Sequence, residues 1–163
     1  MSEIQFSRHP SIRGAYVLAT DQWFPVRRET VFSFFGDAAN LEAITPPWLR
    51  FEVLTPRPIE MHPGQLIDYK LRLHYLPIRW QTEISVWEPS YRFVDRQLKG
   101  PYHFWVHEHT FEEQAGGTLV KDRVEYKVPG GRLVHACLVR RDLERIFTFR
   151  REVLERHFRS SIV

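Results

Sequence analysis

Residues 133–158 read LVHACLVRRDLERIFTFRREVLERHF, a stretch without proline or glycine. It follows the breaker Pro129-Gly130-Gly131, and its apolar residues recur at helical spacing. The pattern predicts one helix of about 25 residues, roughly 38 Å long at about 1.5 Å per residue. On a projection centred on Leu143, the apolar stripe contains Ala136, Val139, Ile146, Phe147, Leu154 and Phe158. A helix of this length can run along a whole sheet.

The chain before this helix predicts short helices and strands, and most of the strands show an alternating apolar and polar pattern. Residues 16–26 predict a strand, 28–35 an amphipathic helix, and 38–44 a second short helix that ends at two prolines. From residue 51 to residue 128, prolines and glycines divide an alternating pattern into about six strands. Two of these have clear apolar faces, formed by Ile67, Tyr69, Leu71 and Leu73, and by Ile78, Trp80, Thr82, Ile84 and Val86. The order predicts an antiparallel meander with one face covered.

The composition fits a single globular domain over residues 1–163. Hydrophobic residues make up 43% of the chain and aromatic residues 14%, which excludes a disordered protein. The 23 Lys and Arg residues barely exceed the 20 Asp and Glu residues, so no nucleic-acid partner is expected. The single cysteine, Cys137, excludes an internal disulfide. We expect a cytoplasmic protein with no signal sequence and no membrane span.

Three charged residues fall on faces that the pattern assigns to the interior. Asp122 alternates with valines on the last strand, and Asp95 shares a face with Phe93. Arg150 falls inside the apolar stripe of the long helix. An unpaired buried charge is costly, so each of these groups needs a partner or a use. Arg150 therefore pairs with Asp95 or Asp122, extends its long side chain to the edge of the helix, or anchors a carboxylate or polarised carbonyl of a ligand.

The motif Trp105-x-His107-x-His109-x-Phe111 places two imidazoles on one strand face, about 7 Å apart. We expect this face to be inward, because the opposite face would bury Glu108. Metal sites also use this spacing, but no Cys, Glu or third His stands at a suitable interval, so neither a metal nor a cofactor is predicted. The histidines are expected to hydrogen-bond to Asp122 or Tyr126, with general acid–base catalysis as the alternative.

Several local sequences resemble those of small stand-alone bacterial proteins of the SRPBCC superfamily. This START-like, Bet v 1-like group includes polyketide cyclase/dehydrase and lipid-transport proteins. The resemblance spans about residues 16–158 and is carried by DAANLEAITPPWL (37–49), Arg79-Trp80, Phe93-Val-Asp95, Gly100-Pro-Tyr102, the motif at 105–111 and Asp122-x-Val124-x-Tyr126. It implies an α+β helix-grip fold, in which a curved antiparallel sheet of about seven strands wraps around the long C-terminal helix.

The resemblance implies binding of a small hydrophobic or amphipathic molecule, such as a lipid, isoprenoid, quinone or polyketide-like ring. The expected contacts are Tyr69, Leu71, Trp80, Ile84, Phe93, Asp95, Trp105, His107, His109, Phe111, Asp122, Val124, Tyr126, Phe147, Arg150 and Leu154.

Two alternatives stay open. One is a cofactor-independent cyclase or dehydratase, in which His107, His109 or Asp122 moves protons and Arg150 or Tyr126 stabilises an enolate. The other is a regulatory or interaction protein whose cavity is filled by its own aromatic side chains. The chain is expected to be a monomer or a homodimer, because a free strand edge would permit a dimer without requiring one.

Overall fold

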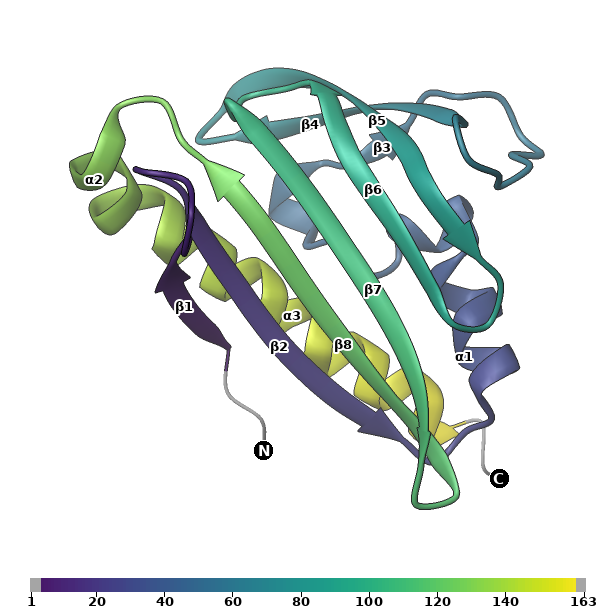
Figure 1. Ribbon diagram of the computed structural model, residues 1–163. Coiled ribbons are helices and arrows are strands. Elements are labelled where there is room, and N and C mark those ends of the chain that lie inside the picture. Colours follow the sequence, from purple (N-terminus) through teal and green to yellow (C-terminus); the bar gives the residue numbers. More distant parts are fainter. Residues whose placement is uncertain (1–3, 161–163) are drawn as a thin grey trace.

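The computed structural model describes residues 4–160 and contains an antiparallel sheet of eight strands curved around a C-terminal helix (Figure 1). The strands are β1 (Gln5–Arg8), β2 (Tyr16–Phe24), β3 (Glu52–Val53), β4 (Leu66–Leu73), β5 (Leu76–Glu88), β6 (Arg92–Lys99), β7 (Phe104–Gln114) and β8 (Gly117–Lys127). Their order in the sheet is β1-β2-β8-β7-β6-β5-β4-β3. The predicted helix-grip fold is confirmed, and the short edge strand β1 adds to the expected strands.

Helices lie at both ends of the meander. Between β2 and β3 come α1 (Arg28–Phe35) and two 3-10 turns, η1 (Ala38–Leu41) and η2 (Pro47–Leu49). After β8 the chain forms α2 (Gly131–Val134), a π-helical turn η3 (His135–Val139) and α3 (Arg140–Ser160) in direct succession. Helix α1 has the predicted bounds, whereas the second short helix is a single 3-10 turn that ends before Ile44. Within residues 4–160, no helix is both long enough and apolar enough to cross a membrane.

Helix α3 lies behind the sheet along β8 and β2 (Figure 1), and its apolar stripe packs directly on these strands. Leu154 and Phe158 join a core cluster that includes Phe24, Phe111 and Val120. Nearer the N-terminal end of the helix, Leu143 and Phe147 join a second cluster with Leu18, Val124 and Tyr126. Burial of each large apolar side chain contributes about 1.5–3 kcal/mol, so this contact holds α3 against the sheet.

Two local irregularities change which side chains face inward. The π turn inserts an extra residue before α3, so His135 is buried and Ala136, predicted to lie on the inner stripe, is exposed. In β5 the register skips Ser85, because Ile84 pairs with Asp95 and Val86 with Val94. This bulge turns Trp87 onto the core, where its ring lies 5.1 Å from that of Phe32. The prediction that Val86 faces inward is therefore wrong.

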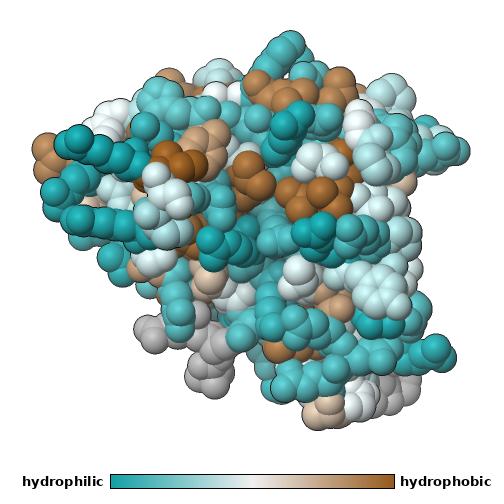
Figure 2. Space-filling view, viewed as in Figure 1, coloured by the Kyte–Doolittle hydropathy of each residue, from teal (hydrophilic) through white to brown (hydrophobic). Residues whose placement is uncertain are grey.

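The outer face of the sheet is mostly hydrophilic, with hydrophobic side chains in small groups (Figure 2). At the turn between β4 and β5, Tyr75 and Leu76 are among the most exposed large hydrophobic residues described. The contrast between the two faces fixes the register of every long strand, because a slip of one residue would expose the core.

Candidate functional site

A cavity of about 190 Å³ lies between α3 and the inner face of strands β4 to β7. Its wall is mainly apolar and aromatic, with Asp95, His107, His109 and Arg150 as its ionisable acid, imidazole and guanidinium groups. Of the residues predicted to contact a ligand, the structure places these in the wall: Tyr69, Leu71, Trp80, Ile84, Phe93, Asp95, Trp105, His107, His109, Phe147 and Arg150. The expectation that the protein's own aromatic side chains fill the cavity is not met.

Five of the predicted contact residues do not line the cavity. They are Phe111, Asp122, Val124, Tyr126 and Leu154. All five lie in the part of the molecule where α3 packs directly on β7 and β8, so their side chains are covered by the helix or by each other. Their inward orientation was predicted from strand alternation and, for Leu154, from the helical projection, but neither pattern distinguishes a packed interior from a cavity wall.

Some of the cavity residues that were missed come from connecting segments or from the end of a helix. Leu49, Phe51 and Met61 line the wall between η2 and β4, and Phe35 reaches it from the end of α1. The segment Pro46-Pro47-Trp48 forms part of this side of the molecule. Trp48 itself stays about half exposed, and its ring contacts Phe149 of α3 edge-on at 5.6 Å. It therefore covers the junction between η2 and α3 from outside the cavity.

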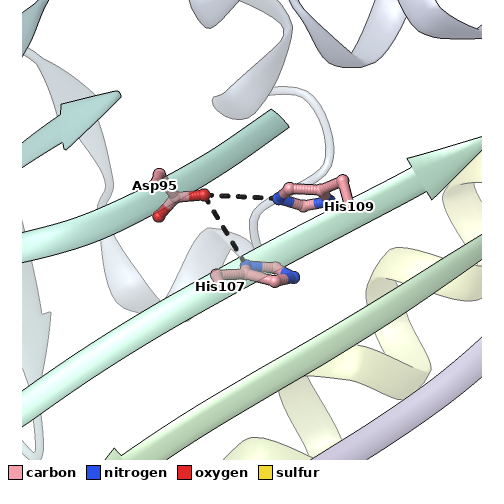
Figure 3. Close-up of side chains that lie close together, drawn as sticks. All are labelled: Asp95, His107 and His109. Atoms are coloured by element: carbon pink, nitrogen blue, oxygen red, sulfur yellow. Dashed lines mark hydrogen bonds and ion pairs between the residues drawn. The ribbon is translucent and has the colours of Figure 1, made fainter. Parts of the chain in front are cut away.

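Sheet pairing brings four polar side chains together on the inner face. Asp95 on β6 pairs with His107 on β7, and His109 on β7 pairs with Asp122 on β8. Cross-strand partners project from the same face of a sheet, so the two carboxylates flank the two imidazoles. Figure 3 shows Asp95 directed at both rings from the neighbouring strand. Both histidines are buried, as the predicted orientation of β7 requires.

Each imidazole contacts a carboxylate on either side. His107 Nε2 donates to Asp122 Oδ1 at 3.0 Å, and His107 Nδ1 lies 4.0 Å from Asp95 Oδ2. His109 Nε2 donates to Asp95 Oδ2 at 3.3 Å. His109 Nδ1 lies only 2.6 Å from Asp122 Oδ1, but the contact is not aligned as a hydrogen bond and is best described as an ion pair.

The charges of the cluster follow from these contacts. Burial alone would raise the pKa of Asp122, but the charges of His109 and Arg150 and the contacts with both histidines hold it well below its usual value. The same balance lowers the pKa of Asp95. Burial lowers the pKa of His107. Burial is also the largest single effect on His109, but the Asp122 charge and the contacts with Asp122 and Asp95 together outweigh it and raise the pKa of His109. At neutral pH both aspartates are charged and His107 is neutral.

Arg150 lines the cavity without an ion-pair partner. Among residues 4–160, the ion pairs of Asp95 and Asp122 are all with His107 and His109. The Nε of Arg150 is buried and makes no hydrogen bond. Its guanidinium carbon lies 5.4 Å from the centre of the Phe35 ring. The alternative in which Arg150 pairs directly with an aspartate is therefore not what the described residues form.

Tyr126 has a different partner from the one expected. Its hydroxyl lies 2.9 Å from His135 Nε2, and the His135 ring stacks on Tyr16 with ring centres 3.4 Å apart. Tyr126 therefore supports the start of the C-terminal helix and does not reach the cavity. The prediction that a histidine of the 105–111 motif bonds to Asp122 is confirmed for His107.

Comparison with known sequences gives one family match. A family model described as "Polyketide cyclase / dehydrase and lipid transport" matches residues 24–151, which include the whole polar cluster and Arg150. No curated protein matches the chain in sequence.

Solved structures share the fold over most of the chain. TTHA0849 from Thermus thermophilus has a TM-score of 0.70 at 15% identity, covering 89% of this chain and 98% of that one. Ginseng major latex-like protein 151 from Panax ginseng has a TM-score of 0.63 at 12% identity, covering 88% and 97%. The di-domain ARO/CYC StfQ from the steffimycin biosynthetic pathway has a TM-score of 0.69 at 11% identity, covering 91% of this chain and 52% of that one. Such low identities establish the fold alone.

Proposed function

The chain belongs to the polyketide cyclase/dehydrase and lipid transport family, and we propose that its cavity binds a small amphipathic molecule whose anionic or carbonyl group is held by Arg150. Family membership confirms the resemblance indicated by the sequence motifs and supports hydrophobic-ligand binding or cyclase activity in general terms. The nature of the head group and the size of the ligand are inferred from the cavity.

The observation that carries the proposal is that Arg150, in a mainly apolar wall, has no ion-pair partner among the described residues and has a buried Nε without a hydrogen bond. Arg150 is the one arginine or lysine among the described residues that line the cavity. A buried donor such as this Nε is costly to leave without a partner, and a planar guanidinium binds a carboxylate through two parallel hydrogen bonds. Asp95 and Asp122 are already engaged by the histidines. A ligand acceptor would therefore satisfy Arg150 without disrupting the cluster.

The walls favour an aromatic or short apolar ligand. Trp80 and Trp105 meet edge-on with ring centres 5.6 Å apart, and Tyr69 lies beside Trp80. The cavity of about 190 Å³ is smaller than the roughly 300–1,000 Å³ typical of sites for drug-sized ligands. A molecule of one or two rings, or a short acyl chain, fits this space better than a long lipid.

The proposed setting is the cytoplasm, where the exposed Cys137 thiol would remain reduced.

Binding of 2-naphthoate and of its uncharged analogue 2-naphthamide tests the role of Arg150. The two probes share a ring system and differ in charge, and tryptophan fluorescence reports their binding. We expect the wild-type protein to prefer naphthoate. Because a hydrogen bond to a charged group contributes about 1.5–3 kcal/mol, Arg150→Gln should weaken naphthoate binding by about 10- to 100-fold. A hydrogen bond to the neutral carbonyl of naphthamide contributes only about 0.5–1.5 kcal/mol, so the loss for naphthamide should be about 10-fold at most.

Arg156→Gln is the matched control, because Arg156 lies on the same helix but is exposed. It removes the same charge without touching the cavity, so it should not change the affinity for either probe. Equal losses in both variants would mean that Arg150 acts only through long-range charge. If neither probe binds, and native mass spectrometry of protein purified from its own host finds no small molecule, the proposed binding function is wrong.

A second candidate function is proton transfer of the cyclase or dehydratase type. It is favoured by the His107–Asp122 hydrogen bond, which orients an imidazole in the same cavity wall that contains Arg150. In this scheme His107 Nδ1 removes a proton next to a ligand carbonyl, and Arg150 stabilises the enolate oxygen. The protonated imidazole then returns a proton to carbon, so the groups are restored. Asp122 and Tyr126 take no direct part because neither lines the cavity.

Hydrogen–deuterium exchange separates this activity from simple binding. In deuterated buffer, the protein would accelerate exchange of the α-hydrogens of 1-tetralone, a small aromatic ketone, as followed by NMR. His107→Gln should remove the acceleration, while His103→Gln, which alters an exposed histidine just before the same strand, should keep it. A wild-type rate equal to the buffer rate would leave binding alone as the supported function.

A further inference from the structure

We propose that Asp95, His107 and His109 form a binding site for a divalent transition-metal ion, with Asp122 orienting the two imidazoles from outside the site. One donor atom from each of the three residues can be chosen so that all lie within 4.8 Å of one another. The two histidines come from one strand and the carboxylate from its neighbour (Figure 3). Two imidazoles and one carboxylate are a donor set that binds iron, zinc and related ions.

The donor spacing is close to what a metal requires. Bonds of about 2.0–2.2 Å to N and O ligands, in tetrahedral geometry, place neighbouring donors about 3.3–3.5 Å apart. Asp95 Oδ2 already lies 3.3 Å from His109 Nε2 and 4.0 Å from His107 Nδ1. Small rotations of the two rings would bring the three donors, which already lie within 4.8 Å of one another, to this spacing. The metal would replace the hydrogen between His109 and Asp95 and release it as a proton.

Asp122 supplies the outer contact that metal-bound histidines usually have. Such histidines generally donate their second ring N–H to a carboxylate or carbonyl, which fixes the tautomer and the ring direction. Here Asp122 Oδ1 lies 3.0 Å from His107 Nε2 and 2.6 Å from His109 Nδ1. Once the metal has replaced the hydrogen on His109 Nε2, a proton on each of the nitrogens facing Asp122 would leave the opposite nitrogens of both rings free to bind the ion beside Asp95.

The surroundings indicate which metals fit and where a ligand would enter. Imidazole donors favour zinc, iron, cobalt and nickel over magnesium and calcium, which prefer oxygen. Because all three proposed ligands line the cavity, the remaining coordination positions would open into it. A divalent ion would balance the charges of the two aspartates and leave the Arg150 charge in excess. The site would then prefer an anionic ligand.

Metal binding and proton abstraction by His107 use the same atom. With His107 Nε2 engaged by Asp122, His107 Nδ1 either accepts a proton or binds the metal, but not both. The metal proposal does not depend on ligand binding at Arg150, and its test uses metal alone.

Titration of the chelator-treated protein with Co²⁺ is the direct experiment. Cobalt in a site of two imidazoles and a carboxylate has visible absorption bands that report its coordination, and calorimetry gives the affinity and stoichiometry. We expect one Co²⁺ per chain. Asp95→Asn and His107→Gln should each weaken binding by 100-fold or more. Asp122→Asn should keep the stoichiometry and weaken binding by about 10- to 100-fold, as expected for an outer contact.

His74→Gln is the control for metal held at the surface. His74 is exposed and contacts Asp142 at 2.6 Å. It is therefore an example of a histidine and a carboxylate that meet at the surface and not in the cavity. Its loss should leave Co²⁺ binding unchanged. The proposal is overturned if the wild-type chain takes up no Co²⁺, if Asp95→Asn and His107→Gln bind as tightly as wild type, or if His74→Gln abolishes binding.

A measurement on the unaltered chain covers the case in which a cluster variant fails to fold. With ¹⁵N-labelled histidine, diamagnetic Zn²⁺ should shift the ring nitrogen resonances of His107 and His109 and leave those of the exposed His62 and His103 in place. Shifts confined to exposed histidines, or no shifts at all, would overturn the proposal.

Discussion

The inner face of the sheet is packed in two different ways along its width. Over β2 and β8, the side chains of α3 interlock with the strands, and residues such as Leu154 and Phe158 are almost completely enclosed. Over β4 and β5, apolar residues of the same kinds face a cavity. Leu71 and Ile84 belong to this hollow half, with Ala38 and Leu49 closing it from the connecting segments.

The difference shows how one sheet can serve both stability and binding. The packed half holds the helix in place through close contacts, whereas the hollow half keeps apolar side chains in position without filling the space between them. The polar cluster spans the boundary, because Asp122 lies on β8 beneath the helix and Asp95 lies on β6 in the cavity wall. The packed half therefore orients the histidines that the hollow half exposes to a ligand.

The largest expected effect comes from making the same substitution in both halves. Leu154→Ala should lower the free energy of unfolding by about 3–4 kcal/mol, because it opens a new void in a packed cluster. Leu71→Ala enlarges a cavity that already exists, so we expect about 2 kcal/mol, the low end for a buried leucine. Urea unfolding of both variants measures the difference. Equal losses would mean that the hollow half is as tightly packed as the other half.

A pair of tyrosine variants gives a smaller and more local contrast. Tyr126→Phe removes the hydroxyl paired with His135 in the packed half and should cost about 1–2 kcal/mol, because it leaves a buried nitrogen without a partner. Tyr102 lines the cavity, and among residues 4–160 its hydroxyl has no hydrogen-bond partner. Tyr102→Phe should thus change stability very little. A cost at Tyr102 as large as that at Tyr126 would contradict this assignment.

The smallest predicted effect is a pH dependence at the packed end of the helix. Burial, and secondarily the charge of Arg140, lower the pKa of His135. The unfolded chain therefore binds a proton on His135 more tightly than the folded chain does. The contribution of neutral His135 to folding stability is complete above the unfolded pKa of about 6.5 and is lost as the pH falls below it. Between about pH 7.5 and about pH 5.5, wild type should lose more stability than His135→Phe, which keeps a ring against Tyr16. Parallel urea profiles in the two proteins would refute this.

The amino-acid sequence predicted the main elements and the inward charges, because both depend on local periodicity. Helix α1, the long C-terminal helix and the inward orientation of Asp122 all follow from spacings of two or about 3.6 residues. The bulge at Ser85 and the π turn at His135 each add one residue to a regular pattern, and nothing in the alternation marks their positions.

The polar cluster was only partly predictable for a related reason. His107 and His109 are neighbours on one strand face, but their approach to Asp95 depends on the register between β6 and β7. That register is set by the turns and by burial over the whole sheet. The sequence therefore contained every donor of the cluster without showing that Asp95 is the third. In the same way, Leu49 and Phe51 reach the cavity from segments without a regular pattern.

The short strands at the two edges of the sheet limit how another chain can add to it. The outermost strands β1 and β3 contain four and two residues, while β5, β7 and β8 contain 13, 11 and 11. Extended edges present rows of unpaired amide and carbonyl groups, which recruit further strands and promote aggregation, and natural proteins counter this with short edge strands. The long strands that hold the cluster are protected by their place inside the sheet. Their backbone groups are already paired, so an intruding β-strand has little to bind.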